Sequence, residues 1–213
     1  TMVRKTYRNP DASSDLILPM LLICNTTEDT IQKNVRRSTT LDIPWLEFHV
    51  EQDHKAIMVG GGPSLVDDLD AIREQQAAGA KVFAMNGASR FLRKHGIEPD
   101  CQVICDAKPE SVSLYDPECQ LHYLASQCDP AMFEQPGDKV LWHLAVPDVE
   151  TWFPEERRLR GGYSLIGGGA TVGITAMCVA FVLGYRTLEI YGYDSSHKQG
   201  ESHAYRQAMN DEI

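Results

Sequence analysis

Residues 56–70 read Ala-Ile-Met-Val-Gly-Gly-Gly-Pro-Ser-Leu-Val-Asp-Asp-Leu-Asp, and this stretch decides the fold. The apolar residues at its start predict a buried strand. The glycines that follow predict a tight turn. The proline after them is favoured at the first position of a helix, where its missing N–H would have no partner anyway. Ser64 and Asp67 fit a capping box at the start of that helix.

A strand, a glycine turn and a helix N-terminus together form a common anion-binding arrangement. N–H groups point outward, the helix dipole is positive there, and glycine lets a phosphate approach closely. The same pattern also forms a tight strand-to-helix turn without a ligand, and both interpretations stay open. The residues that would contact a nucleotide phosphate here are Gly60, Gly61, Gly62, Pro63 and Ser64.

Apolar runs and helical stretches alternate around this turn, and the helical stretches end at a glycine, as helices commonly do. The runs that predict strands are 56–59, 81–85, 101–105, 121–125, 139–145 and 187–191, and the predicted helices are 65–78, 87–95 and 170–183. Such alternation predicts an α/β fold: a Rossmann-like, doubly wound, mostly parallel sheet with helices on both faces. We expect this domain to span 55–213, after a short N-terminal extension over 1–54. Residues 146–168 are expected to form a long functional loop.

The composition narrows the classes of partner. The chain has 213 residues and a net charge of −10, which disfavours nonspecific binding to nucleic acid. Its six cysteines form no Cys-x-x-Cys motif, so we expect reduced, buried thiols and no zinc site. No apolar stretch is long enough to span a bilayer. We expect a cytoplasmic protein that binds no nucleic acid and has no membrane span, and a homo-oligomer is left open.

Polar residues follow the predicted strands at the sheet edge where ligands of such folds bind. Asn86 follows the second strand and could bind a base or ribose, or only shape a turn. Asp106 follows the third strand and Asp194 the last. A carboxylate at a strand end can hold Mg²⁺ together with substrate phosphates, and it can equally cap a turn.

A second glycine-rich turn precedes the apolar helix predicted over 170–183. Gly168, Gly169 and Thr171 suit contact with a second phosphate, although glycines also let a buried helix pack tightly on a sheet. His203 lies on a polar segment after the last strand. There it could act as a general base or contact a phosphate, and a lone surface histidine is also commonly inert.

Several of these motifs occur in an order that resembles a known family. They are Val-Gly-Gly-Gly-Pro-Ser-Leu at 59–65, Lys-His-Gly-Ile-Glu-Pro-Asp at 94–100, Cys-Asp-Ala at 105–107, Gly-Gly-Ala-Thr-Val at 168–172, Ile-Tyr-Gly-Tyr-Asp at 190–194 and Ser-His-Ala at 202–204. The set resembles the 6-hydroxymethylpterin diphosphokinase-like family, which includes the motility accessory factors. The resemblance implies a nucleotide-dependent transferase that moves a diphosphate from ATP to a small hydroxylated acceptor. Asp106, with Asp194, would then hold Mg²⁺, and His203 would orient or deprotonate the acceptor.

A more distant resemblance is to bacterial sialyltransferases that use CMP-sialic acid. It rests on the Gly-Pro-Ser-Leu turn, Asn86 and the helix opening at Thr171. It implies a glycosyltransferase with a CMP-activated sugar as the alternative function. Gly61 departs from those enzymes, which carry asparagine there, so a side-chain contact to the nucleotide would be missing. A third hypothesis is a non-catalytic domain that binds a nucleotide or a sugar.

Overall fold

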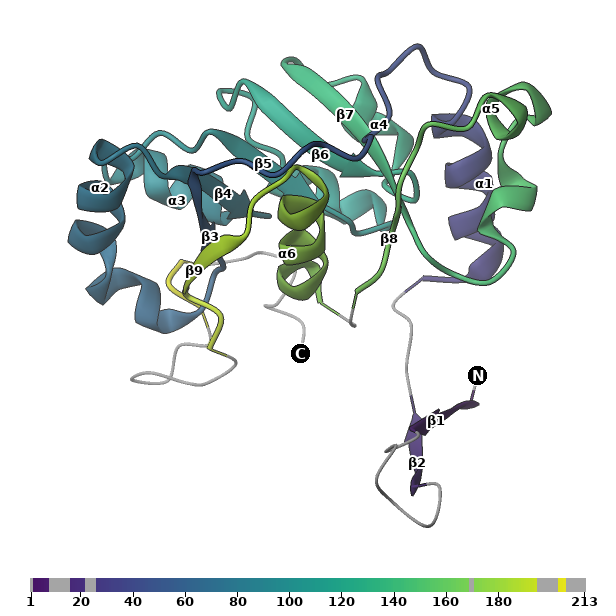
Figure 1. Ribbon diagram of the computed structural model, residues 1–213, viewed down its shortest axis with the longest axis horizontal. Coiled ribbons are helices and arrows are strands. Elements are labelled where there is room, and N and C mark those ends of the chain that lie inside the picture. Colours follow the sequence, from purple (N-terminus) through teal and green to yellow (C-terminus); the bar gives the residue numbers. More distant parts are fainter. Residues whose placement is uncertain (1, 8–15, 22–25, 169–170, 195–202, 206–213) are drawn as a thin grey trace.

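The computed structural model describes residues 2–7, 16–21, 26–168, 171–194 and 203–205. Its centre is a seven-stranded parallel sheet that curls into a half-barrel with helices around it (Figure 1). In spatial order the strands are β8 (Leu165–Ile166), β7 (Asp138–Leu144), β6 (Leu121–Ala125), β5 (Cys101–Ile104), β4 (Lys81–Met85), β3 (Lys55–Val59) and β9 (Thr187–Tyr191). This confirms the predicted α/β fold.

The strand order reverses between β3 and β9. From β3 the chain steps outward strand by strand to β8, and it then returns to β9 on the other side of β3. In open α/β sheets, ligands bind beyond the carboxyl ends of the strands at such a reversal. We call this position the switch point, and the glycine turn that follows β3 lies at it.

Helices cover both faces of the sheet, as predicted. Side chains of β3 alternate between the faces: Ala56 and Met58 pack in the cluster that contains α6 (Val172–Val182), whereas Ile57 and Val59 pack in the other cluster. That second cluster holds α2 (Leu69–Ala77) and α3 (Ala88–Lys94). This alternation follows from the two-residue period of a strand.

Segment 46–52 crosses the C-terminal end of α6. The N–H of His49 donates to the carbonyl of Val182 at 2.8 Å, and the N–H of Gln52 donates to that of Gly184 at 3.0 Å. Gly184 has φ +93°, and a Cβ there would collide with the carbonyl of Val50. Glycine is therefore required for this segment to lie against the helix end.

Helix α1 (Glu28–Ser38) covers the carboxyl ends of β5 and β6. Its buried Asn34 donates to the carbonyls of Ala107 and Gln127, at 3.3 and 3.0 Å. Ser38 Oγ donates to the carbonyl of Ser126 at 2.7 Å. These strand ends are therefore closed by α1, whereas the switch point lies at other strands of the sheet.

Three local predictions were wrong: the single helix over 65–78, its capping box, and the loop over 146–168. The predicted helix over 65–78 is split into the 3₁₀ helix η1 (Pro63–Asp67) and α2, and no side chain caps η1, so the capping box is absent. Segment 146–168 is not a plain loop, because it contains η3 (Val149–Trp152), α5 (Glu155–Arg160) and β8. These elements have too few residues to show a period.

The N-terminal residues contain an antiparallel pair, β1 (Met2–Tyr7) and β2 (Leu16–Leu21). The remaining elements are η2 (Pro109–Leu114) and α4 (Pro130–Phe133).

The thiols Cys101, Cys119 and Cys128 are buried, as predicted, whereas Cys105 and Cys178 are only partly buried. Burial raises the pKa of Cys105 to about 12, so this thiol stays protonated at neutral pH. None of the helices in the described part of the chain is long and apolar enough to cross a membrane.

Candidate functional site

The first glycine turn packs directly against the end of β9. The N–H of Gly60 donates to the carbonyl of Tyr191 at 2.9 Å, and that of Gly62 donates to Gly192 at 2.7 Å. A Cβ on Gly60 would collide with the carbonyl of Gly192. The glycines therefore have a structural reason to be present, because two backbones meet here without space for a side chain.

Asp194 places a carboxylate at the start of η1. Ser64 Oγ donates to Asp194 Oδ1 at 2.5 Å, and the N–H of Ser64 lies 3.3 Å from Oδ2. These are the groups that were predicted to contact a phosphate. In this structure an anion does bind them, but it is the protein's own carboxylate, which comes from a residue 130 positions away.

Tyr193 connects β9 to the first turn of α6. Its hydroxyl donates to the carbonyl of Gly173 at 3.1 Å and lies 3.7 Å from the sulfur of Met85. A Cβ on Gly173 would lie 2.7 Å from the ring. Burial raises the pKa of Tyr193, so the hydroxyl keeps its proton and remains a donor. Tyr193 and Asp194 together join the N-terminus of α6 to the first glycine turn.

The side chain of Thr171 caps the N-terminus of α6. Thr171 Oγ1 accepts the N–H of Ile174 at 3.4 Å. Gly168 packs beside the helix, because a Cβ there would lie 2.6 Å from Thr175 Oγ1. Close packing thus accounts for Gly168, and its contact with a ligand stays a prediction. Gly169 lies outside the described residues.

Residues 203–205 lie over the first glycine turn. The N–H of Ala204 donates to the carbonyl of Gly61 at 3.0 Å. Tyr205 packs against Gly61 and Gly87, where added Cβ atoms would lie 2.6 and 2.8 Å from it. An asparagine in place of Gly61, as in the sialyltransferases, would meet this ring. His203, whose ring centroid is 6.4 Å from that of Tyr205, is thereby brought to the switch point.

Asn86 occupies a strained position at the end of β4. Its φ is +49°, in the left-handed region that few residues other than glycine adopt. Its carbonyl accepts the Gln102 side chain at 2.7 Å. Its Oδ1 is buried and has no hydrogen-bond partner among the described residues. Backbone strain and an unsatisfied buried polar atom commonly mark ligand sites.

Asp106 lies at the end of β5, where its Oδ1 is 3.2 Å from the N–H of Lys108. This is the geometry of a turn aspartate. The described residues contain no group of three or more His, Cys, Asp or Glu side chains that could hold a metal. Asp194 is bonded to Ser64, and the magnesium site at Asp106 and Asp194 stays a prediction.

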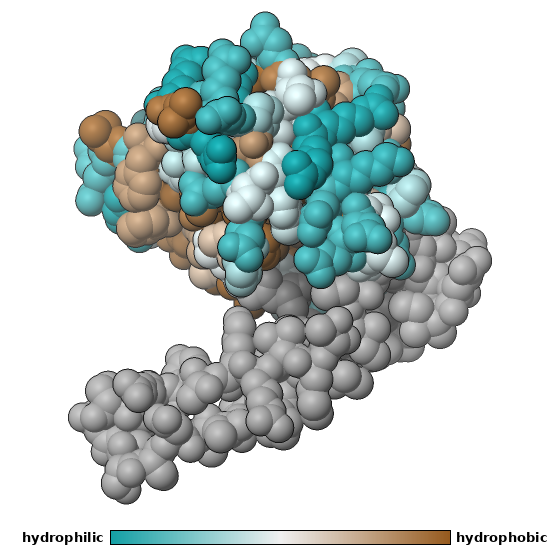
Figure 2. Space-filling model, turned by 90° about the vertical axis from the view of Figure 1, so that its right-hand side faces the viewer, coloured by the Kyte–Doolittle hydropathy of each residue, from teal (hydrophilic) through white to brown (hydrophobic). Residues whose placement is uncertain are grey.

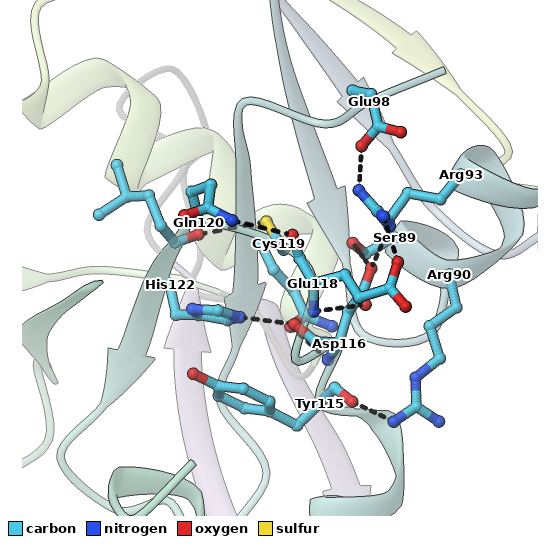
Figure 3. Close-up of polar contacts among 12 residues, drawn as sticks. Ser89, Arg90, Arg93, Glu98, Tyr115, Asp116, Glu118, Cys119, Gln120 and His122 are labelled. Carbon is cyan, nitrogen blue, oxygen red and sulfur yellow. Dashed lines mark hydrogen bonds and ion pairs between the residues drawn. The ribbon is translucent and has the colours of Figure 1, made fainter. Parts of the chain in front are cut away.

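Two further features lie away from the switch point. A cavity of about 710 Å³ lies around segment 42–49, and one of about 340 Å³ lies at the starts of β4, β5 and β6. His49, Tyr123 and Leu183 line both. A buried polar cluster lies beside α3, where Ser89 and Arg93 contact Asp116 (Figure 3). Ser89 is fully buried and donates to Asp116 at 2.6 Å, so its role is structural.

The family model described as 6-hydroxymethylpterin diphosphokinase MptE-like matches residues 29–200. The chain belongs to this MptE-like family. The match includes most of α1 and the whole seven-stranded sheet. No curated protein matches the chain at a significant level.

Among solved structures, this MptE-like chain is similar to the MAf glycosyltransferase from Magnetospirillum magneticum AMB-1. The TM-score is 0.68 and the sequence identity is 22%. The similarity covers 81% of this chain and 28% of that chain, so the MptE-like chain spans little more than a quarter of the relative. At this identity the likeness shows the shared fold.

The contact between Gly62 and Asp194 leads to a testable prediction. A Cβ at position 62 would lie 2.7 Å from the carbonyl oxygen of Asp194 and would collide with its carboxylate. We expect Gly62→Ala to break the bonds to Ser64 and to lower the free energy of unfolding by about 2 kcal/mol. Chemical denaturation measures this. Gly167→Ala is the control, because a Cβ there has no neighbour within 4 Å. Equal effects of the two changes would contradict the prediction.

Proposed function

We propose that this MptE-like chain is a transferase whose nucleotide donor binds at the switch point. We further propose that the donor is a sugar activated by a nucleoside monophosphate, such as a CMP-sugar. The family supports a transferase-like role. The observation that carries the finer proposal is the bond between Asp194 and Ser64, at 2.5 Å.

The bond between Asp194 and Ser64 affects which donor could bind, because its carboxylate occupies a position that a phosphate could otherwise take. Because Asp194 already fills the anion position at η1, the N-terminus of α6 is the second position at which a phosphate could bind. A donor with one phosphate needs one such position. A triphosphate carries several more charges and is normally bound with Mg²⁺ through carboxylates. Asp194 would first have to leave Ser64 to provide one.

The residues at the switch point would have separate tasks. The Asn86 amide would bind the base or ribose, and the first turn of α6, with Thr171, would bind the phosphate. The acceptor hydroxyl would attack the anomeric carbon while the bond from that carbon to the phosphate oxygen breaks. His203 would take the hydroxyl proton, and the nucleoside monophosphate would leave.

Diphosphate transfer from ATP is the second candidate, and the description of the family model favours it. It would require Asp106 and a released Asp194 to hold Mg²⁺ with the substrate phosphates. The name of the solved relative, a glycosyltransferase, favours the first candidate. The two candidates differ in their nucleotide and in their dependence on magnesium.

A thermal-shift panel separates the candidates. We expect CMP and a CMP-sugar to raise the melting temperature without Mg²⁺. Ligand at 100 times its Kd stabilises by about 2.7 kcal/mol, which corresponds to a rise of roughly 5–10 °C. Asn86→Gly keeps the left-handed backbone and removes the amide, so it should lose the shift. Asn86→Asp, which keeps Oδ1, should retain part of it.

The opposite pattern would contradict this proposal. A shift with ATP that requires Mg²⁺, and none with CMP, would support diphosphate transfer. If CMP binds but no sugar is transferred to any acceptor, the chain is a binding domain.

A further inference from the structure

The ring of Tyr205 lies between two glycines that belong to different turns. Gly61 lies in the turn after β3, and Gly87 lies between β4 and the start of α3. An added Cβ on Gly61 would meet the hydroxyl at 2.6 Å and the Cε1 edge of the ring at 3.3 Å. One on Gly87 would meet the opposite edge, Cε2, at 2.8 Å. We call the space between Gly61 and Gly87 the tyrosine slot.

Backbone conformation does not explain why both walls of the tyrosine slot are glycines. Neither Gly61 nor Gly87 has a positive φ. Gly87 has φ −68° and ψ −7°, which are helical angles that alanine adopts readily. At both positions the three atoms nearest to an added Cβ all belong to Tyr205. The missing side chains therefore make room for this one ring.

Further contacts hold the segment 203–205 at the switch point. The N–H of Ala204 donates to the carbonyl of Gly61 at 3.0 Å. The Tyr205 ring lies 5.6 Å from that of Phe91 on α3, measured between centroids. Ala204 and Tyr205 both pack against the apolar cluster that contains α2 and α3. By contrast, the surface that carries α1 and α5 is largely hydrophilic (Figure 2). The segment is thus packed against the domain by apolar contacts.

This packing determines where His203 lies. The centroid of its ring is 6.4 Å from that of Tyr205. Tyr205 in turn contacts Gly87, which directly follows Asn86. A general base must lie within about 2.6–3.2 Å of the atom whose proton it takes. Because a displacement of about 1 Å can slow a reaction roughly 100-fold, the contact that fixes this segment would control the base.

We propose that Tyr205 is a positioning residue, whose ring in the tyrosine slot holds His203 beside the donor site. The inference rests on the proposed function for the role of His203. Tyr205 acts through His203 and takes no part in the chemistry itself. The bond from Ala204 would still let the segment pivot, whereas a ring held along two edges fixes its direction.

NMR of the histidine ring C–H groups tests the positioning without a ligand. His203→Gln identifies the His203 signals among those of the seven histidines. We expect Tyr205→Ala and Gly87→Ala each to move these signals toward their positions in the urea-unfolded chain. Tyr205→Phe keeps the ring and should leave them nearly in place. Gly167→Ala is the control, because a Cβ there has no neighbour within 4 Å, and it should not move them.

The effects of the two substitutions should not add, because both empty or block the same slot. In Tyr205→Ala the added Cβ of Gly87→Ala no longer meets the ring, so the His203 signals should move no further. Urea denaturation should show that Gly87→Ala destabilises the unaltered chain but not Tyr205→Ala, since alanine suits this backbone conformation. A general defect of α3 would instead lower stability equally in both backgrounds.

CMP separates this inference from the proposed function. CMP should raise the melting temperature of the unaltered chain and of Tyr205→Ala alike, because Asn86 and α6 remain. Bound CMP should shift the His203 signals in the unaltered chain and not in Tyr205→Ala. With a CMP-sugar, Tyr205→Ala should release CMP about 100-fold more slowly at saturation, with KM unchanged.

The outcomes have distinct meanings. If CMP does not bind the unaltered chain, the proposed function fails, and the ligand-free signals of His203 still decide whether Tyr205 positions it. The positioning role is overturned if Tyr205→Ala leaves those signals in place, or if its effect adds to that of Gly87→Ala. It is also overturned if bound CMP leaves the His203 signals of the unaltered chain unchanged, or shifts them equally in both proteins.

Discussion

Replacing Asp116 with alanine should lower the free energy of unfolding by about 3 kcal/mol, because the carboxylate makes two hydrogen bonds in a nearly dry environment. Asp116 is 3% exposed. It accepts the Ser89 hydroxyl at 2.6 Å and the N–H of Glu118 at 3.2 Å (Figure 3). Arg93 Nε lies 3.6 Å from the same carboxylate. Removing the carboxylate leaves the buried Ser89 hydroxyl without its acceptor.

Asp116 also fixes the segment that leads into β6. Its N–H donates to Gln102 Oε1 at 3.0 Å, and its carbonyl lies 3.0 Å from His122 Nε2. The His122 ring stacks on that of Tyr115 at 4.0 Å. These backbone contacts survive the substitution, so the loss measures the carboxylate itself.

Urea denaturation of Asp116→Ala and Ser89→Ala compares the loss of the whole carboxylate with the loss of one of its hydrogen bonds. Ser89→Ala removes one of the bonds but leaves the carboxylate beside Arg93, so we expect a smaller loss of about 1–2 kcal/mol. The m-value should stay unchanged, since the same surface is exposed on unfolding. If Asp116→Ala cost less than Ser89→Ala, the carboxylate would not be the centre of this cluster.

The strands could be predicted from the sequence because each shows its own local pattern. The run 81–85 and the strand β4 coincide, and 187–191 and β9 also coincide. Their parallel order followed from the helices between them. The position of β9 beside β3 could not be read from any local pattern, because it depends on packing between segments about 130 residues apart.

The site was predicted in part for the same reason. Because the carboxyl ends of parallel strands share one edge, the turn after β3 and Asp194 after β9 were both expected there. The bond between Ser64 and Asp194 could not be predicted, since a carboxylate and a phosphate suit the same N–H group equally well.

Tyr193 and Tyr205 were missed as parts of the site. Both act through rings that cover glycines, Tyr193 over Gly173 and Tyr205 over Gly61. The signal that could have found them is the presence of glycines whose backbone angles do not require glycine. None of the glycines at 60–62 has a positive φ. Such glycines indicate that something passes close by, and here the neighbours are β9 backbone, a carboxylate and a tyrosine ring.

His143 is expected to make the protein sensitive to acid. Its side chain is fully buried, with ring centroids 4.4 Å from Trp45 and 4.2 Å from Phe153. Neither ring nitrogen has a hydrogen-bond partner among the described residues. Tyr163, the other ring beside it, donates its hydroxyl to Glu150 instead. Burial therefore lowers the pKa of His143 to about 3.

The sign of the effect follows from proton uptake. Below pH 6.5 the unfolded chain binds a proton at His143 while the folded chain does not, so stability falls as pH falls. Between pH 7 and pH 4 this one group should cost roughly 3 kcal/mol. His143→Leu should remove that loss, and it should add about 1 kcal/mol at pH 7 by removing unsatisfied nitrogens. His122, whose pKa burial also lowers, remains in both proteins and cancels in the comparison. Urea denaturation at both pH values gives the difference, and parallel losses in the two proteins would show that His143 has a partner in solution.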